Sequence, residues 1–449
     1  MKKTIVCTVL AGLLLASLFS ACSGKAEGAS AGGSASSAGG KIAVKYWYPW
    51  GGDSETWDKW RMAEFEKDQD KYAIESTYVP EGGGVRNGKL MAAINSGDVP
   101  DLVVSDAPTQ SYALATQGAF EPIDEALKQI GFDSSRANQG LLSYMQWKGV
   151  TYIYPQNTDI TLLFYRTDLF EEAGLDPNNP PKTIAELDEY ARRLTKLNPN
   201  GVDVDRYGFI PWLDAGADPS TWTWQFGADV YDESADKVTL ANDGVARVYE
   251  WQRSYAQSAD PERMRSFTTS LGAAFSPDHA FMQGKVAMTA MGNWFCNALR
   301  IHAPQVKYGV APLPAYSPEA YGGAALAGNV FFSPKGAKEV VGAMTFADYC
   351  QSAKIVEDNN RQWRSLGIYV DGIEGLSLYQ ENDPYLKICI DVTFNPHSGP
   401  WALSPVTAEL DDKLRAFTDV AIYTKDDIRS GLAAMQGELQ TEVDRSLRR

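Results

Sequence analysis

The sequence predicts an α/β protein built on an open sheet, and three observations support this prediction. Short apolar segments alternate with amphipathic ones from residue 41 onward, as strands alternate with helices. The segment 101–106 has a Leu-Val-Val centre, which is typical of a strand buried on both faces of a parallel sheet. The chain has 449 residues, 44% hydrophobic and 22% charged, so it has the composition of a globular protein and the length of two domains.

The expected elements follow one another along the chain. An alternating, aromatic-rich strand begins the body, and a helix, a strand, a short helix and the buried strand follow it. These five elements are expected at 41–49, 57–67, 74–79, 89–95 and 101–106. Further strands are expected at 150–154, 162–166, 207–211, 286–291, 308–312 and 325–333.

Some helices have signals at their ends or along one face. Thr183 and Glu186 form a capping box, and the apolar residues after Thr183 recur at helical spacing. Ser276 followed by Pro277 predicts a helix start, and Gly284 is placed to end that helix. The last helix has an apolar stripe, which is more often core packing than a partner surface. This stripe consists of Leu432, Met435, Leu439 and Val443.

The N-terminus has the layout of a secretory signal peptide, with basic residues before an apolar run over 5–19. The run is shorter than the roughly 20 apolar residues of a spanning helix. Ser20-Ala21-Cys22 resembles the lipobox of bacterial lipoproteins, which implies loss of 1–21 and acylation of Cys22, for example by palmitate. An ordinary cleaved signal with an incidental cysteine is the alternative. The Ser-, Gly- and Ala-rich segment 22–40 predicts a flexible tether to a membrane anchor, outside the cell or in the periplasm.

Charge and cysteine content narrow the partners. The formal net charge is −16, and loss of 1–21 removes two lysines and no acids, which leaves −18. So negative a surface disfavours nucleic acid and anionic lipid headgroups. Three cysteines remain beyond the leader and Cys22, and none forms a close Cys-x-x-Cys pair. One long-range disulfide between two of them is possible, but three buried free thiols are the favoured interpretation. These cysteines are Cys296, Cys350 and Cys389.

Two short motifs suggest ligands that their details do not support. The segment 83–90 nearly spells a phosphate-binding loop, but Leu90 stands where such a loop has the Ser or Thr that ligates magnesium. The segment 198–205 resembles a calcium-binding loop without its leading aspartate, and a plain turn is favoured. The three histidines are scattered without metal-ligand spacing. We therefore expect neither a metal nor a cofactor.

Four segments, in this order, resemble family 1 of the extracellular solute-binding proteins of bacterial ABC transporters. The first reads Asn-Ser-Gly-Asp-Val-Pro-Asp-Leu-Val-Val, and the second reads Leu-Phe-Tyr-Arg-Thr-Asp-Leu-Phe-Glu-Glu-Ala-Gly-Leu-Asp with Pro-Lys-Thr-Ile-Ala-Glu-Leu after it. The third joins Ala-Phe-Met-Gln-Gly-Lys-Val-Ala-Met to Gly-Asn-Trp, and the fourth joins Tyr-Gly-Val-Ala-Pro-Leu-Pro to a Gly-Gly segment. They lie at 95–104, 163–187, 280–294 and 308–329.

The resemblance implies a two-lobed periplasmic-binding-protein fold of type II, whose chain crosses between the lobes three times. The crossings are expected near 154–158, near 313–316 and within 364–372. The N-terminal lobe would then comprise 41–155 plus 315–366, and the C-terminal lobe 157–312 plus 370–449. The ligand would lie in the cleft, around which the lobes close.

Tryptophans are the strongest candidates for contacts with such a ligand. Twelve are present, and a flat indole can stack on the C–H face of a sugar ring. The resemblance places five in cleft-facing loops, whereas burial in the core is the alternative for each and is favoured for Trp57, Trp60 and Trp251 within helical patterns. Two of the five, Trp222 and Trp224, point the same way if their segment is extended. The other three are Trp50, Trp294 and Trp401.

Polar contacts are expected from loops at strand ends. Asp106 ends the strand 101–106, at the edge where α/β sheets bind ligands, and its carboxylate can accept two hydroxyl protons. A helix cap for the segment after Pro108 is its alternative role. Gly51 and Asp53 follow the first strand and can offer a backbone amide and a carboxylate. Weaker candidates are Asp159, Asn293 and Asn329.

Two functions of different class fit this pattern. The first is a lipid-anchored, monomeric, non-enzymatic receptor that binds a sugar or oligosaccharide and delivers it to the permease subunits of an ABC importer. The alternative is a secreted glycosidase with a carboxylate pair in the cleft, because the acids of such enzymes have no short signature. The sequence has no Gly-x-Ser-x-Gly and no His-Glu-x-x-His motif, which favours binding.

Overall fold

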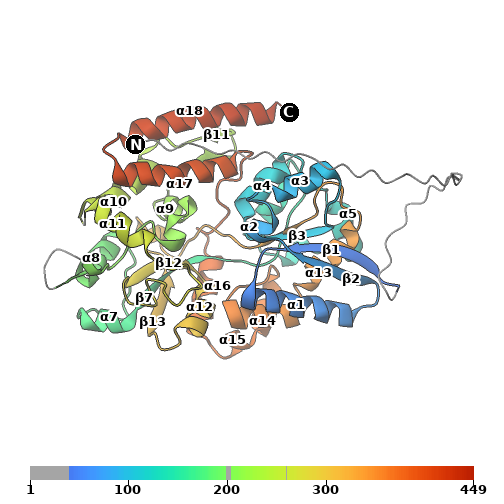
Figure 1. Ribbon diagram of the computed structural model, residues 1–449, viewed down its shortest axis with the longest axis horizontal. Helices are drawn as coiled ribbons and strands as arrows, with labels where there is room; N and C mark the ends of the chain where they lie inside the picture. The colour runs from blue at the N-terminus through green and yellow to red at the C-terminus, as the bar shows by residue number, and fades with distance from the viewer. Residues whose placement is uncertain (1–39, 199–203, 259, 449) are drawn as a thin grey trace, which may run out of the picture. The chain divides into compact units, whose positions relative to one another are not determined.

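The computed structural model of this protein describes residues 40–198, 204–258 and 260–448 (Figure 1). The predicted signal peptide, Cys22 and nearly all of the tether lie outside the described residues, as do positions 199–203 of the suggested calcium loop. The described residues all belong to one compact unit. It contains two main sheets, and the chain passes from one to the other several times.

The first sheet is mixed and has the strand order β2-β1-β3-β14-β6. Its first three strands are parallel, and β14 runs antiparallel to both of its neighbours. The strands are β1 (Ile42–Tyr48), β2 (Tyr72–Tyr78), β3 (Leu102–Ser105), β14 (Val330–Phe332) and β6 (Tyr154–Pro155). The helices near it, on the right in Figure 1, are α1 (Gly52–Asp68), α2 (Pro80–Gly83), α3 (Lys89–Ser96), α4 (Pro108–Thr116), α5 (Asp124–Ile130) and α13 (Val340–Tyr349).

The second sheet is antiparallel and has the order β12-β7-β13, on the left in Figure 1. Alternate residues of its central strand enter different cores, since Leu162 and Phe164 join one apolar cluster, and Leu163 and Tyr165 another. The strands are β12 (Met288–Gly292), β7 (Thr161–Arg166) and β13 (Tyr308–Pro312). The helices after them or beside them include α7 (Thr167–Glu172), α8 (Ile184–Leu194), α9 (Pro219–Gln225), α10 (Asp243–Ser258), α12 (Phe295–His302), α16 (Pro384–Thr393), α17 (Thr407–Tyr423) and α18 (Ile428–Leu447).

Three segments lie side by side where the chain passes between the sheets. Thr158 pairs with Leu366, and Asp159 pairs with Ala327, both in antiparallel bridges. The bridge between Thr158 and Leu366 thus joins the two segments expected to contain the first and third crossings, 154–158 and 364–372. At the second, Ala315 still pairs with Thr183 at the start of α8, so the chain leaves the second sheet's elements later than 313–316. The lobe boundaries stay a prediction.

Most strands and helices lie where the sequence predicts them, and the capping box of Thr183 and Glu186 is present in full. The helix expected after Ser276 is wrong. The Ser276 hydroxyl oxygen accepts only the Asp278 amide, and a series of turns leads to Gly284, which has a φ of 69°. The strand expected at 207–211 is reduced to one bridge pair, between Tyr207 and Val286.

Two other predicted strands are shorter or divided. The strand at 150–154 becomes β5 (Val150–Thr151), which forms a hairpin with β4 (Gln146–Trp147), and the separate β6. Of 325–333, only β14 is regular. Residues 325–333 pair in turn with Gly399, with Asp159 and with strands β3 and β6, so they form no single continuous ladder.

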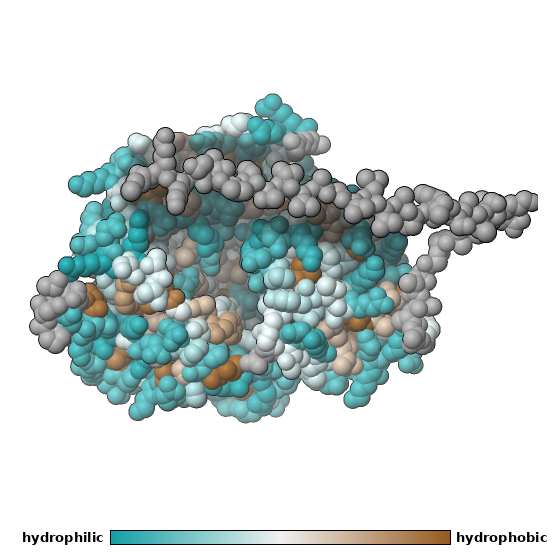
Figure 2. Space-filling view, viewed as in Figure 1, coloured by the Kyte–Doolittle hydropathy of each residue, from teal (hydrophilic) through white to brown (hydrophobic). Residues whose placement is uncertain are grey.

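The core confirms two further predictions. The stripe on α18 packs inward, with Leu432, Leu439 and Val443 fully buried and Met435 partly buried. The three described cysteines are free and buried. Figure 2 shows a mostly hydrophilic surface, in keeping with the net charge of −16. In the described part of the chain, no helix has the length and apolar character needed to cross a membrane.

Candidate functional site

A cavity of about 920 Å³ lies where the crossing segments meet the ends of both sheets. Pockets for small ligands are typically of about 300–1,000 Å³, and Figure 2 shows this face hollowed near its middle. The aromatic lining residues are Trp50, Trp57, Phe275, Trp294, Trp363 and Trp401. The charged ones are Arg86, Asp106, Asp159, Asp218, Asp411, Asp412 and Arg415. Neutral polar residues complete the lining, among them Thr109, Gln156, Asn157, Thr161, Ser220, Asn329, Asn359 and Ser365.

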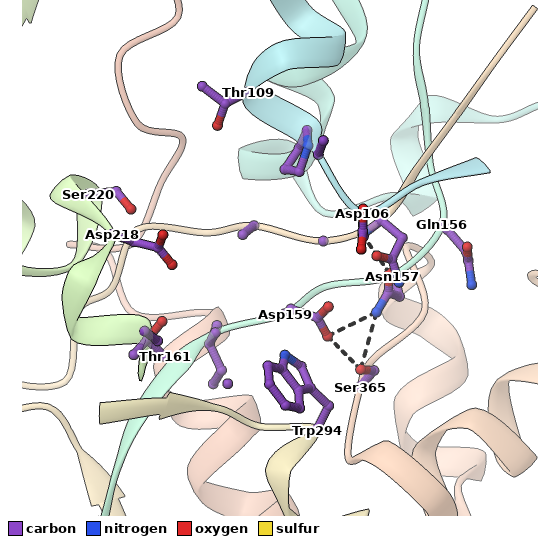
Figure 3. Close-up of a pocket in the computed structure, with 18 of the residues that line it drawn as sticks. Asp106, Thr109, Gln156, Asn157, Asp159, Thr161, Asp218, Ser220, Trp294 and Ser365 are labelled. Carbon is purple, nitrogen blue, oxygen red and sulfur yellow. Dashed lines mark hydrogen bonds between the residues drawn. The ribbon is translucent and has the colours of Figure 1, made fainter. Parts of the chain in front are cut away.

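Asp159 lies in the first crossing segment, at the floor of this cavity (Figure 3). Its Oδ1 accepts hydrogen bonds from Asn157 Nδ2 at 2.9 Å and from Ser365 Oγ at 2.6 Å. Burial raises the pKa of Asp159, and the hydrogen bonds from Ser365 and Asn157 oppose this shift only in part. The carboxylate thus joins two crossing segments through Oδ1, and it also lines the cavity.

Asp106 follows β3, and its carboxylate pairs with Arg86. Arg86 Nη1 lies 2.7 Å from Asp106 Oδ1, and Nη2 donates to the Asp106 carbonyl at 2.9 Å. The alternative role as a helix cap is wrong, because α4 begins after Ala107 without a side-chain cap. Arg86 itself belongs to the segment 83–90 that resembles a phosphate-binding loop. In the structure its guanidinium binds the carboxylate and the backbone carbonyl of Asp106.

The second cationic residue of the lining, Arg415 on α17, is also paired. Its Nη2 lies 2.7 Å from Asp218 Oδ1 and 3.1 Å from Asp411 Oδ2. Burial raises the pKa of Asp411, and the charge of Arg415 opposes that rise. Among the described residues of the cavity wall, both guanidiniums are therefore neutralised, and carboxylates outnumber them.

Trp294 presents its indole at the cavity wall because of the residue two places before it. A Cβ on Gly292 would lie 2.2 Å from Trp294 Nε1, so only glycine at the end of β12 lets the ring take this position. Phe275 stacks on the indole with 5.4 Å between ring centroids and 16° between the planes. Trp294 is partly buried, and in Figure 3 its ring lies next to Asp159.

Three further predicted residues line the cavity. Trp401 is only 6% exposed, and its Nε1 donates to Thr223 Oγ1 at 3.1 Å. Asn329 lies beside the first crossing, where its backbone N–H donates to Asn157 Oδ1 at 2.9 Å. Trp50 lies two residues after the end of β1 and is partly buried. Together with Asp106, Asp159 and Trp294, these residues come together as the sequence suggests.

Two predicted tryptophans are not in the lining. Both lie on helix α9, not on an extended segment. In an α-helix, side chains two positions apart in the sequence differ by about 200° around the axis, so these two indoles point to different sides. Trp222 is 1% exposed, and its Nε1 donates to the Pro211 carbonyl at 2.6 Å, so its interpretation as a cleft residue is wrong and the core alternative holds. Trp224 Nε1 donates to the His397 carbonyl at 2.9 Å, outside the cavity lining.

Asn293, Gly51 and Asp53 complete the predicted set. Asn293 is 1% exposed, its Oδ1 accepts the Ile160 amide at 2.9 Å and its Nδ2 donates to Ser365 Oγ at 3.1 Å. It therefore holds the crossing segments together behind the cavity instead of lining it. Gly51 is exposed outside the lining. The side chain of Asp53 lies outside the described part of the structure.

Several lining residues were missed by sequence reasoning. Trp57, interpreted as core, is 8% exposed, but it also lines the cavity from α1. Gln156 and Asn157 lie in the crossing predicted near 154–158, so their polar character at an expected crossing was a usable signal. Gln156 Oε1 is buried without a partner in the described structure. The described residues contain no group of three or more His, Cys, Asp or Glu side chains suited to a metal ion.

This fold and this site define a class of protein: the chain matches the bacterial extracellular solute-binding proteins over residues 31–357 and belongs to that family. The family resemblance seen in the sequence is therefore confirmed, as is the two-lobed α/β fold of periplasmic binding proteins. The match covers both main sheets and most of the residues that line the cavity.

The similar proteins bind different solutes. The sn-glycerol-3-phosphate-binding periplasmic protein UgpB of Brucella abortus (strain 2308) is 31% identical over 134 residues, which are 29% of this chain and 31% of that protein. The chain thus matches about a third of the length of such relatives. The structure of CpMnBP1 with mannobiose bound is 29% identical, with a TM-score of 0.76 over 88% of this chain and 99% of that one. UgpB of Mycobacterium tuberculosis with glycerophosphocholine is 19% identical, with a TM-score of 0.74 over 91% of this chain and all of that one, and so shows the fold alone.

Proposed function

We propose that this protein is the extracellular substrate-binding component of an ABC importer, that it captures a sugar or oligosaccharide, and that it passes this ligand unchanged to the permease. The observation that carries the proposal is the cavity lining: it combines aromatic rings with neutral and acidic polar groups, and both guanidiniums are already paired. The matching family and solved neighbours are binding proteins, which favours capture over the hydrolysis expected of a glycosidase.

Each part of the lining has a role with a pyranose. The indole of Trp294 covers a C–H face of the ring and excludes water from it. The Asp159 and Asp106 carboxylates accept hydroxyl protons in charge-assisted hydrogen bonds. Gln156 Oε1, which has no partner in the described structure, is a further acceptor in the same wall. Trp50, Asn329 and Trp401 complete the set of ligand contacts that we propose.

The charges of the cavity favour a neutral ligand over a phosphate ester. Five aspartates and two arginines line it, and each arginine lies 2.7 Å from a carboxylate oxygen. A phosphate would have to displace one of these carboxylates from its guanidinium while facing the others. This supports a mannobiose-type ligand, such as CpMnBP1 holds, over the glycerol phosphate named for UgpB.

We also propose the placement of the protein in the cell. Cys22 would be acylated after removal of 1–21, and 22–40 would tether a monomeric body outside the membrane. The N-terminal lobe, 41–155 plus 315–366, and the C-terminal lobe, 157–312 plus 370–449, would close around the ligand. Mass spectrometry of the membrane fraction tests the anchor, because a diacylated or triacylated N-terminal peptide beginning at Cys22 is the expected product.

A glycan panel tests the binding function. The protein is incubated with mannose, glucose, galactose and xylose oligosaccharides and with sn-glycerol 3-phosphate, and its Tm is measured. A sugar should raise the Tm and change tryptophan fluorescence without release of reducing ends, whereas the phosphate ester should do neither. Reducing ends released from a bound sugar would favour the glycosidase, and a response to the phosphate ester alone would reject the sugar.

A further inference from the structure

A second hollow, of about 510 Å³, lies beside the cavity described above. Trp57 lines both. The residues around the second hollow are Thr56, Trp57, Trp60, Asn297, Arg300, Ile301, Asp358 and Gln362. None of these residues except Trp57 takes part in the lining of the first cavity.

The same three elements form the walls of both hollows. On α14 (Ala353–Trp363), Asn359 and Trp363 line the first, and Asp358 and Gln362, one position earlier, line the second. They therefore occupy adjacent rows of one helix surface. Likewise α1 contributes Ser54 to the first and Thr56 to the second, and the segment after β12 contributes first Trp294 and then, from α12, Asn297. The two hollows therefore lie next to each other, and Trp57 is the residue that lines both.

Trp57 stands at the junction and is held firmly. Its Nε1 donates to Asp358 Oδ2 at 2.7 Å, and Gln362 Nε2 donates to the same oxygen at 2.6 Å. The buried guanidinium of Arg61 lies on the ring, with its Cζ 4.7 Å from the centroid. A ligand that spans the two hollows would pass this fixed indole, which lines both of them.

The second hollow contains groups suited to a sugar ring. Asn297 is 1% exposed, and its Oδ1 has no hydrogen-bond partner in the described structure. Trp60 is partly buried and offers an indole in the same wall. Arg300 is exposed and makes no ion pair with any described residue, unlike both arginines of the first cavity. An acceptor, a donor and an aromatic face are thus available together.

We infer that the ligand is an oligosaccharide of at least three rings, whose inner rings fill the first cavity and whose outer ring passes Trp57 to contact Trp60, Asn297 and Arg300. The inference rests on the proposed function, because it extends the same binding site. It predicts that affinity depends on chain length, and that a change at Trp60 affects long ligands alone.

The test is a calorimetric titration of the full-length protein with oligosaccharides of two and of five units. The probes are β-1,4-linked mannose, glucose and xylose and α-1,4-linked glucose. The wild-type protein is compared with Trp60→Ala and with Tyr379→Ala, an exposed aromatic residue on α15 (Ser377–Gln380) that lines neither hollow. Thermal melting of each variant checks that the fold is kept.

We expect the five-unit form of one series to bind at least about ten-fold more tightly than its two-unit form, and Trp60→Ala to remove most of that gain. The two-unit form should bind wild-type and Trp60→Ala protein equally, and Tyr379→Ala should change neither. Equal affinity for both lengths, or a Trp60→Ala loss that is the same for both, would overturn the extended site while the sugar cavity stands. If no sugar bound at all, both proposals would fall.

Discussion

At the scale of single residues, recognition depends on which polar groups the protein has already paired. Arg86 and Arg415 are paired with carboxylates, whereas Gln156 Oε1 lacks a protein partner in the described structure. Asp159 uses Oδ1 to join the crossing segments, so a ligand that contacts this carboxylate acts on the same group. Under the proposed function, the residue that would bind the ligand is thus also part of the segments that join the two sheets.

Trp294→Ala should weaken binding of the best ligand from the glycan panel by roughly ten-fold or more, because the indole face is lost while the backbone around it stays. Isothermal titration calorimetry measures the effect. Trp224→Ala is the matched control, since that indole lies outside the cavity lining, and it should keep wild-type affinity. The same affinity in wild type and Trp294→Ala would remove this tryptophan from the site.

Asp159→Asn should separate binding from stability. Because burial raises the pKa of Asp159 in the folded state, its charged form opposes folding at neutral pH, and its contribution to stability is greatest at acid pH and is lost as pH rises through the folded pKa. The uncharged variant should therefore melt about 1–2 °C higher at pH 7 and bind more weakly. The difference in Tm should shrink as pH falls toward 4. A variant that melts lower at pH 7 would contradict this.

Residues at strand ends were predictable and residues from distant helices were not. Asp106 and Trp50 follow strands, so their place at the cavity follows from the sheet. Arg415 meets Asp218 across 197 positions of sequence, and no local pattern indicates that contact. Trp222 was misplaced because a helix, not an extended segment, holds it.

At the scale of elements, local signals were reliable where packing agreed with them. The capping box at Thr183 begins α8, whose apolar face is buried, and β13 has the bounds that its sequence predicts. Ser276 and Pro277 give an equally clear start signal, but the segment after them forms turns around buried His279 and Phe281. Burial of these two side chains within a few residues is met by turns, so tertiary packing prevents the helix that the local start signal favours.

Removal of the cap at α8 has an expected cost. Thr183→Ala should lower the free energy of unfolding by about 1 kcal/mol, because the Glu186 amide loses its hydrogen-bond acceptor at the start of the helix. Urea denaturation followed by circular dichroism measures the change. Thr183→Ser keeps the hydroxyl and should retain most of the wild-type stability. Equal loss in both variants would show that the methyl group, not the cap, matters.

Helix α1 carries a buried ion pair that should be sensitive to change. Asp58 and Arg61 are fully buried and in direct contact, and the Tyr46 hydroxyl accepts from Arg61 Nη2 at 2.7 Å. Arg61→Met should lower the free energy of unfolding by about 3–5 kcal/mol, since the Asp58 charge is left without its partner. Addition of Asp58→Leu should recover much of the loss in the same urea titration. Failure to recover it would indicate that packing of the arginine chain dominates.

At the scale of the whole molecule, two sheets are joined by three adjacent crossing segments, and the cavity lies at this junction. The family resemblance made this architecture predictable from four short motifs. The exact positions of the crossings were less predictable. After β13 the chain still pairs with Thr183 and hydrogen-bonds to the Gln225 carbonyl before it returns to the first sheet at β14.

The net charge of −16 gives a prediction for the whole molecule. A neutral sugar is not steered by this field, so its affinity should change less than about two-fold between 50 and 500 mM NaCl. Calorimetric titrations at several salt concentrations measure this. A steep dependence on salt would indicate a charged ligand and would argue against the pairing of Arg86 and Arg415 as the basis of selectivity.

The most direct test of the central claim is a crystal structure of the protein grown with the tightest-binding oligosaccharide of the panel. We predict an intact sugar in the cavity, with one ring on the Trp294 indole and hydroxyl groups within hydrogen-bond distance of Asp159 and Asp106. An empty cavity with the sugar bound elsewhere, or a cleaved sugar within it, would contradict the account.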